Sequence, residues 1–159
     1  MPDDMPLREA TLDDVPTLVN HRRRMFEEMD ALRGKVHEPA MLDAMGVAYA
    51  LYLRGCIADG RLRAWVIEAG GRIVASGAVS FLDWPPRPDD LGQRLALLHS
   101  VYTEHSHRRL GLARRIVECA IDACRSAGLK RLSLHASDAG RRLYESMNFK
   151  PTNEMRLAL

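Results

Sequence analysis

The stretch HSHRRLGLARR, residues 105–115, gathers four arginines and two histidines around a single glycine. A strand-like run, RLALLHSVYT (residues 94–103), precedes it, and a helical pattern begins at Gly111. Where a strand leads into a helix, unpaired backbone N–H groups and the positive end of the helix dipole meet at one point. Gly111 lets the backbone come close to a ligand, so the stretch predicts a site for a phosphate or pyrophosphate.

The stretch lacks the two best-known phosphate-binding patterns. No GK[ST] follows the glycine, which excludes a Walker loop, and only one of the three glycines of a dinucleotide fingerprint is present. From composition alone, a solvated basic surface at the start of a helix is the alternative interpretation.

Toward the C-terminus, apolar residues continue the helical pattern as far as Gly128. Ile116, Val117, Ala120, Ile121 and Cys124 form the apolar stripe. Beyond Gly128 the sequence predicts a strand at residues 130–136, a helix capped by Ser137, and a last strand at residues 151–159.

Toward the N-terminus, the sequence predicts a short strand, two helices and a β-hairpin. Thr11 and Asp14 form a capping-box variant at the start of the first helix, and Pro39 begins the second. Gly70–Gly71 joins two strands into the hairpin, and the proline-rich residues 83–90 form a loop.

The resulting order is β-α-α-β-β-β-α-β-α-β. The strands at residues 94–103 and 130–136 flank a helix, so we expect them to be parallel inside a mostly antiparallel sheet. The fold class predicted is α/β of the α+β type, with helices on both faces of a mixed sheet. Residues 1–159 are expected to form a single domain.

Two segments carry a resemblance to a known family. RRLGLA, Arg108 to Ala113, is similar to the R/Q-x-x-G-x-G/A signature of the GNAT superfamily of acyl-CoA-dependent N-acetyltransferases. SDAGRRLYESMNF resembles that family's N-x-x-A-x-x-L-Y-E-x-x-G-F segment, with Ser137, Gly140 and Asn148 in place of Asn, Ala and Gly. The order of elements agrees too, and the resemblance is strongest over residues 95–159.

The resemblance implies acetyl-CoA as co-substrate and assigns roles in binding it. Amides from Arg109 to Arg114 would hold its pyrophosphate, main-chain groups of Val101 to Thr103 would pair with its pantetheine arm, and the two parallel strands would splay to admit it. Tyr144 would protonate the leaving thiolate. The cofactor-binding residues implied are Val101, Tyr102, Thr103, Arg108, Arg109, Leu110, Gly111, Leu112, Ala113, Arg114 and Ser137.

An amine acceptor must lose a proton before it attacks. A lysine-like amine has a pKa of about 10.4, so a base, or a water chain to one, is expected. We predict His99 as this base, because regular alternation would put it on the same strand face as Val101 and Thr103. A buried structural histidine is the alternative, and Glu27, Glu28 and His135 are weaker candidates for the base.

The acceptor is expected over the first two helices and the proline-rich loop. HRRRMFEEMD (residues 21–30) contributes Glu27 and Glu28, which could hold a cationic amine, although a solvated helix face is the default interpretation. Trp84 in DWPPRP could form an apolar wall of the substrate site, or belong only to a sheet connection.

Charge and cysteine usage limit the partners. The formal net charge of +2 argues against a nucleic-acid partner. Three cysteines without a CxxC pair indicate reduced thiols and a cytoplasmic protein. The N-terminus lacks the features of a signal peptide and no run approaches 18 apolar residues, so no membrane segment is expected. His105 and His107 lack further ligands nearby, so no metal is expected.

The function predicted is transfer of acetyl from acetyl-CoA to a primary amine, on a small molecule or a peptide, by direct attack in a ternary complex. The alternative is a non-catalytic acyl-CoA-binding or sensor module on the same fold. Because many relatives form pairs, the resemblance also allows a homodimer.

Overall fold

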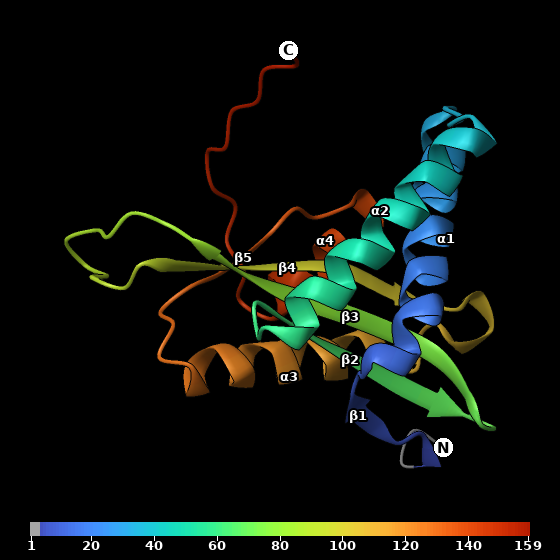
Figure 1. The fold of residues 1–159 in the computed structure, drawn as a ribbon, viewed down its shortest axis with the longest axis horizontal. Helices are drawn as coiled ribbons and strands as arrows, with labels where there is room; N and C mark the ends of the chain where they lie inside the picture. Colours follow the sequence, from blue (N-terminus) through green and yellow to red (C-terminus); the bar gives the residue numbers. More distant parts are fainter. Residues whose placement is uncertain (1–3) are drawn as a thin grey trace.

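The computed structural model describes residues 4–159 and contains one five-stranded sheet with helices on both faces (Figure 1). The elements in chain order are β1 (Leu7–Glu9), a 3-10 turn (Leu12–Asp14), α1 (Val15–Arg33), α2 (Pro39–Ala58), β2 (Leu62–Ala69), β3 (Arg72–Asp83), β4 (Arg94–Thr103), a 3-10 turn (His105–His107), α3 (Leu112–Ser126), β5 (Leu132–Leu134) and α4 (Asp138–Ser146).

The sheet follows chain order, β1-β2-β3-β4-β5. The first three pairings are antiparallel, and β4 pairs with β5 in parallel across the α3 crossover. This is the mixed sheet that the sequence predicts, and it confirms the fold class.

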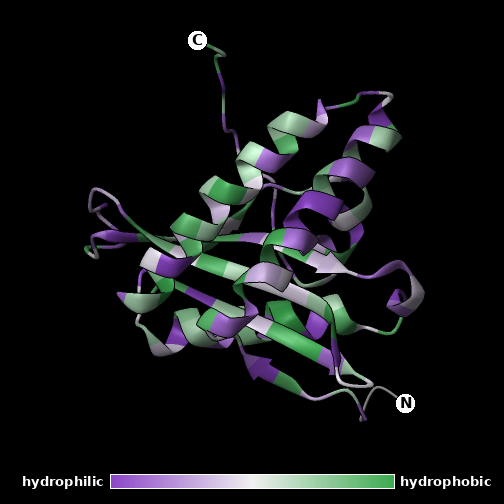
Figure 2. Cartoon of the chain, turned by 45° about the vertical axis from the view of Figure 1, so that its right-hand side comes forward, coloured by the Kyte–Doolittle hydropathy of each residue, from purple (hydrophilic) through white to green (hydrophobic). Residues whose placement is uncertain are grey.

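The two faces of the sheet are covered by different helices. The α1 and α2 helices pack on one face, where Leu18, Tyr49 and Leu53 join β2 and β3 in one apolar cluster. The α3 helix covers the other face, where Ile116, Val117 and Ala120 are fully buried. The α4 helix packs on the α3 side, where Tyr144 and Met147 join the apolar cluster that includes Val117 and Ala120. Hydrophobic residues recur along the central strands and on the helices that cover them (Figure 2).

Local signals in the sequence set several element boundaries. The Thr11 N–H donates to Asp14 Oδ2 at 2.8 Å, as the capping box predicts, and Arg8 binds the same carboxylate. Gly70 and Gly71 both have positive φ, which suits the tight hairpin between β2 and β3. The predicted bounds of β4 are confirmed at both ends.

The prediction of a C-terminal strand at residues 151–159 is wrong. Residues 149–159 have no regular secondary structure, and the end of the chain extends away from the body of the protein (Figure 1). Met155, Leu157 and Leu159 are exposed rather than packed, so their apolar alternation has no neighbouring strand to stabilise it. The fifth strand is also shorter than expected, Leu132–Leu134 instead of residues 130–136.

By length and composition alone, α2 could cross a membrane. One such helix is weak evidence, because core helices of soluble proteins meet the same test. Only one face of α2 is buried: Leu42, Tyr49, Leu53 and Cys56 lie within the fold, whereas Met41, Val47 and Leu51 are exposed.

Candidate active site

The parallel pair β4–β5 opens at one end. Pairing runs from Ala96↔Leu132 to Leu98↔Leu134 and then stops, because β5 ends while β4 continues to Thr103. Within residues 4–159, the second half of β4 therefore has no strand on its β5 side. The resemblance implies that the two strands splay here; in the structure, the early end of β5 leaves a main-chain edge of β4 available to a ligand.

The loop that follows β4 ends in a row of unpaired donors. The backbone N–H groups of the six residues Arg109 to Arg114 donate no hydrogen bond to any group in residues 4–159. Arg109 and Gly111 both have positive φ, 63° and 77°, which turns the chain sharply into α3. Such a turn at a helix N-terminus makes a concave set of donors suited to an anion.

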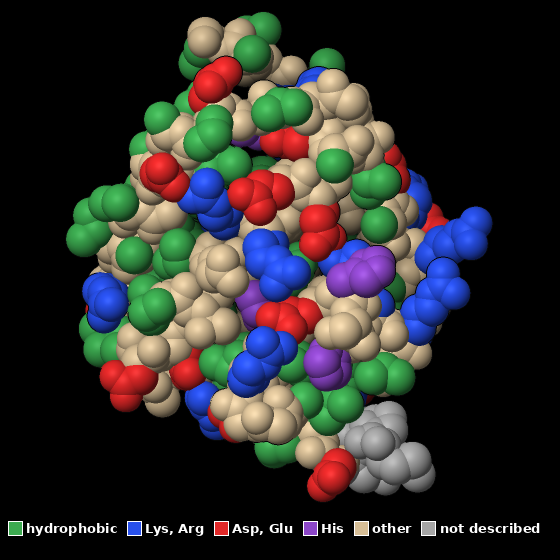
Figure 3. All heavy atoms as spheres, turned by 90° about the vertical axis from the view of Figure 1, so that its right-hand side faces the viewer, with side chains coloured by type: hydrophobic (Ala, Val, Ile, Leu, Met, Phe, Trp, Pro, Cys, Tyr) green, Lys and Arg blue, Asp and Glu red, His purple; other side chains and the backbone are tan. Residues whose placement is uncertain are grey.

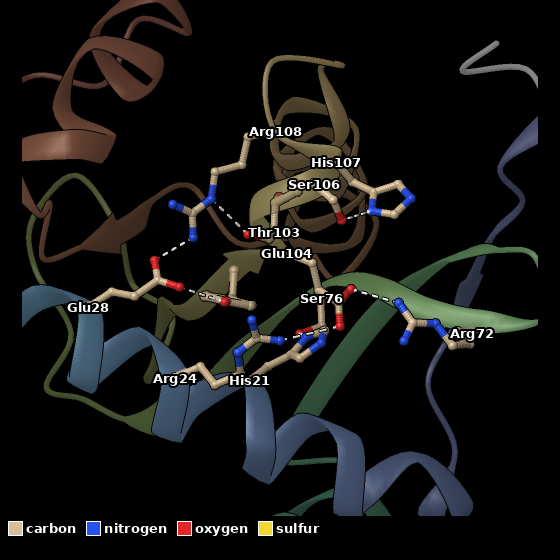
Figure 4. Close-up of polar contacts among 11 residues, drawn as sticks. His21, Arg24, Glu28, Arg72, Ser76, Thr103, Glu104, Ser106, His107 and Arg108 are labelled. Atoms are coloured by element: carbon tan, nitrogen blue, oxygen red, sulfur yellow. Dashed lines mark hydrogen bonds and ion pairs between the residues drawn. The ribbon is translucent and has the colours of Figure 1, made fainter.

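A polar cluster joins this loop to α1 (Figure 4). Arg108 donates to a carboxylate oxygen of Glu28 and, through Nε, to the Thr103 carbonyl at 3.0 Å. The Tyr102 hydroxyl donates to the other Glu28 oxygen at 2.7 Å. Burial acts to raise the pKa of Glu28, but the hydrogen bonds from Arg108 and Tyr102 together lower it, so Glu28 is ionised at neutral pH.

Arg108 and Glu28 therefore form an ion pair with each other. From the sequence, Arg108 was expected to bind the cofactor and Glu28 to bind the acceptor amine. One group beside them lacks a partner: Thr103 Oγ1 is buried and makes no hydrogen bond within residues 4–159. A buried unpaired hydroxyl next to an open strand edge is consistent with a ligand that completes the site.

A β-bulge corrects the predicted orientation of His99. Ser76 pairs with Tyr102 and Ala78 with His99, so Gly77 alone faces both Ser100 and Val101. Ser100 has a φ of 55°, and the extra residue reverses the alternation of β4.

As a consequence, His99 and Val101 lie on opposite faces of the sheet. Val101 packs with Ile116 of α3 near Gly77, and Thr103 pairs with Ala75, which also packs against α3. His99 contacts Tyr49 of α2. The expectation that His99 shares a face with Val101 and Thr103 is wrong, because it assumed a regular strand.

His99 is the centre of a hydrogen-bonded chain on the α1/α2 face. Its Nε2 lies 2.7 Å from Ser80 Oγ and its Nδ1 lies 3.0 Å from Ser100 Oγ. Ser80 is in turn 2.7 Å from the hydroxyl of Tyr52, a half-exposed residue of α2. Burial, with a smaller contribution from the charge of Arg22, lowers the pKa of His99 to about 4. The ring is therefore neutral at neutral pH.

Tyr144 lies on the other face of the sheet, in α4, where it packs against the apolar cluster under α3. Its ring contacts Phe149 edge-on at 5.7 Å, and its hydroxyl makes no hydrogen bond within residues 4–159. Burial raises the pKa of Tyr144, which keeps the proton on the hydroxyl at neutral pH. A Cβ at Gly140 would lie 3.0 Å from Tyr144 Cε2, so the small residue makes room for this ring.

The other residues implied for cofactor binding lie along the loop and at the helix starts. Leu110 is exposed, whereas Leu112, the first residue of α3, is buried against the sheet. Arg114 donates to Ser146 Oγ of α4 at 2.7 Å. Ser137 caps α4, its Oγ accepting from the Gly140 N–H at 3.2 Å, as the capping interpretation expects.

The remaining candidates lie apart from β4. Glu27 is exposed and pairs with Arg23 at 3.0 Å. Trp84 is half exposed and, with Pro85, Pro86 and Gln93, lines a depression where the β3–β4 loop begins. His135 follows β5 and contacts Glu154 of the C-terminal segment. The structure brings none of the three into contact with His99 or the loop.

Sequence reasoning missed the polar neighbours of His99: Ser80, Ser100, Tyr49 and Tyr52. They come from β3, β4 and α2, and no short pattern marks them. The only available signal was the presence of serines inside otherwise apolar strands, at positions where burial requires a hydrogen-bonding partner.

The end of the molecule that carries the loop shows no patch of a single charge (Figure 3). Arginine, carboxylate and histidine side chains are interspersed there, and several arginines are paired with carboxylates, as Arg108 is with Glu28. Within residues 4–159, no three His, Cys, Asp or Glu side chains are arranged to hold a metal ion.

Comparison with known proteins decides the family. The model of the acetyltransferase (GNAT) family matches residues 21–149, more than half of the chain. The chain belongs to the GNAT family. No curated protein sequence matches it.

Solved structures of acetyltransferases share the fold. A GCN5-related N-acetyltransferase from Ralstonia eutropha JMP134 has 29% identity and a TM-score of 0.87, covering 98% of each chain. A predicted acetyltransferase with acetyl-CoA from Clostridium acetobutylicum has 24% identity and a TM-score of 0.85, over 98% of this chain and 96% of that one. Glucosamine-6-phosphate N-acetyltransferase from Arabidopsis thaliana has 18% identity and a TM-score of 0.65, over 98% and 97%. Family and fold together support acetyl transfer in general.

Proposed function

We propose that the protein is an N-acetyltransferase that moves acetyl from acetyl-CoA to a primary amine by direct attack in a ternary complex. The observation that carries the proposal is the row of six free N–H groups, Arg109 to Arg114, directly beyond the strand edge that β5 leaves open. The GNAT family uses acetyl-CoA, and the Clostridium acetobutylicum neighbour is described with it.

The residues present fit this co-substrate. The free N–H groups at the start of α3 suit a pyrophosphate, and the partial positive charge of the helix end favours it. The open edge of β4 from His99 to Thr103, with the unpaired Thr103 Oγ1, suits an amide-containing chain that pairs like a strand. When bound, acetyl-CoA supplies an activated acetyl thioester.

Tyr144 is proposed to hold the proton that the departing sulfur needs. Its raised pKa keeps the hydroxyl protonated, and because the hydroxyl has no partner within residues 4–159, its O–H is free to donate. Since a thiolate is a weaker base than a phenolate, the donated hydrogen bond helps most while charge develops on sulfur.

His99 is proposed to assist loss of the proton from the amine on the opposite face. With a pKa of about 4, the ring is a weak base toward an amine when it acts alone. Its two serine partners extend it into a chain that reaches the Tyr52 hydroxyl near solvent, so the ring can pass a proton rather than store it.

The placement of Tyr144 and His99 on opposite faces supports direct attack. An acetyl group lying in the opening between β4 and β5 would be approached by the amine from the α1/α2 side, while the sulfur leaves toward α4. This arrangement needs no covalent acyl-enzyme. Two of the three cysteines are unsuited to forming one, because burial raises the pKa of Cys119 and Cys124, and the third, Cys56, is buried.

The test is release of free CoA from acetyl-CoA in the presence of a panel of primary amines, detected as a new thiol. Amine-dependent release, with the acetylated amine identified by mass spectrometry, is the expected result. Tight binding of acetyl-CoA with no amine-dependent release would instead favour the non-catalytic binding module.

A further inference from the structure

Three consecutive arginines on α1 differ in their partners. Arg23 pairs with Glu27 at 3.0 Å and also with Asp43, and Arg24 pairs with Glu104 at 3.4 Å. Arg22 pairs with no carboxylate anywhere in residues 4–159. Its charge is therefore the only one of the three that the described protein leaves unbalanced.

Arg22 is nevertheless held in a defined position. Its Nη1 donates to Ser100 Oγ at 2.7 Å, and its guanidinium carbon lies 4.7 Å from the ring centroid of Tyr49 and 5.1 Å from that of Phe26. The side chain is half-buried. Aromatic faces and one hydroxyl fix the guanidinium, while the N–H groups of Nε and Nη2 have no acceptor within residues 4–159.

The position matters because Ser100 is the bulge residue of β4. It lies just past Leu98, where pairing with β5 stops, and it is hydrogen-bonded to His99. Arg22 thus reaches the place on the α1/α2 face where the amine is proposed to attack. Holding a partly desolvated guanidinium there without a counter-charge is unfavourable unless a ligand supplies one.

We propose that Arg22 binds a carboxylate of the acceptor, so that the substrate is an amine carrying a carboxylate near its nitrogen, as in a free amino acid. The proposal rests on the proposed function, since it names the acceptor of the same reaction. The planar fork of a guanidinium matches the two oxygens of a carboxylate, and Nε with Nη2 provides a pair of parallel donors.

The test compares matched pairs of amines with acetyl-CoA as donor: common α-amino acids and the corresponding amino-acid amides. The wild-type protein should acetylate at least one amino acid with a kcat/KM about 10- to 100-fold above that of its amide. This comparison is conservative, because the amine of an amide loses its proton more readily than that of the free acid.

Two variants assign the preference to one side chain. Arg22→Gln should remove most of the preference for the acid, by about 10- to 100-fold, and Arg22→Lys should restore only part of it because the fork is lost. Arg23→Gln, one residue along α1 and outside the site, should keep the wild-type preference. Unchanged melting temperature and acetyl-CoA affinity in Arg22→Gln would show that the fold and donor site are intact.

The outcomes separate this inference from the proposed function. Equal or better turnover of the amides, preference for a phosphorylated amine, or an unchanged preference in Arg22→Gln would overturn the inference while leaving acetyl transfer in place. Absence of both acetyl-CoA binding and amine-dependent CoA release would overturn the proposed function, and the inference with it.

Discussion

The two sides of β4 offer free hydrogen-bond donors of different kinds. On the proposed cofactor side, at the start of α3, the free donors are main-chain N–H groups from Arg109 to Arg114. On the proposed acceptor side, beneath α1 and α2, the donors next to Ser100 that lack an acceptor within residues 4–159 belong to the side chain of Arg22. The first set depends on where a loop turns and a helix begins, whereas the second depends on the identity of a single residue.

This difference indicates that the two sides recognise different kinds of ligand: one shared by the family, the other particular to this chain. Main-chain donors are present whatever side chains surround them, so they suit a co-substrate that a whole family uses. A side chain can be replaced at any position of α1, so it suits a feature particular to one chain. Changes on the cofactor side should therefore alter acetyl-CoA affinity or turnover, and changes on the acceptor side should alter the response to the amine.

The largest effect is expected from Tyr144→Phe. Removing the hydroxyl should lower kcat by about 100-fold or more, because the leaving sulfur loses its proton donor. Acetyl-CoA affinity and stability should stay nearly unchanged, since that hydroxyl makes no hydrogen bond within residues 4–159. Steady-state kinetics beside calorimetry checks both, and a kcat equal to wild type would remove Tyr144 from the mechanism.

A smaller effect is expected when the free N–H groups are displaced. Gly111 and Gly128 stand at the two ends of α3 with φ of 77° and 74°, and an added Cβ meets nothing within 4 Å at either. Alanine at either position should cost about 1–2 kcal/mol of stability from backbone strain. Only Gly111→Ala should also weaken acetyl-CoA binding, by about 10-fold, because relief of the strain moves the anion-binding loop.

Gly128→Ala is the matched control for that pair. Thermal unfolding should show similar losses for both variants, and calorimetry should show wild-type acetyl-CoA affinity for Gly128→Ala. Equal affinity in the two variants would mean that the turn at Gly111 does not hold the co-substrate.

Glu28 of α1 pairs with Arg108 of the loop, and a substitution at Glu28 tells apart two possible roles of its carboxylate. If it neutralises Arg108, as the structure indicates, Glu28→Gln should tighten acetyl-CoA binding by about 3-fold and leave the KM for the amine unchanged. If instead Glu28 holds a cationic amine, as the sequence allows, the KM for the amine should rise and acetyl-CoA affinity should stay the same. Measuring both constants at low ionic strength decides between them.

The smallest effect concerns pH. His99 must be neutral to accept a proton, and its pKa of about 4 reflects burial first and the charge of Arg22 second. Arg22 from α1 is the charged group facing the ring, while α2 contributes Tyr49 directly and Tyr52 through Ser80. A bound carboxylate that balances Arg22 should raise the pKa of His99.

As the pH is lowered, activity should therefore begin to fall at a higher pH in the enzyme–acceptor complex than in the free enzyme. The acid limb of kcat should lie about half a pH unit above that of kcat/KM, since the two profiles report the complex and the free enzyme respectively. The gap should close in Arg22→Gln. Coincident limbs in the wild-type protein would show that the acceptor leaves the charge near His99 unchanged.

The sequence predicted best the parts that local physics specifies. A 3.6-residue apolar period and a glycine at each end defined α3, and the glycine pair defined the β2–β3 hairpin. The same signals predict the loop with its free N–H groups, so the proposed cofactor side could be predicted from the sequence alone.

The arrangement of the acceptor side could not be predicted from the sequence, because tertiary contacts determine it. The bulge depends on Ser100 adopting a positive φ opposite Gly77, and nothing about a serine indicates this. One extra residue turned His99 to the opposite face from the one expected. The network around it draws on three separate elements, and the C-terminal strand failed because its alternation has no partner strand.

Calorimetric titration of the protein with acetyl-CoA, with ATP and a short DNA duplex as controls, tests most directly whether residues 105–115 hold the co-substrate. We expect micromolar binding of acetyl-CoA, about 10-fold weaker binding in Gly111→Ala, and no comparable binding of the DNA. Salt-sensitive binding of DNA with no binding of acetyl-CoA would contradict it, and would make the arginines of residues 105–115 a basic surface instead of a cofactor site.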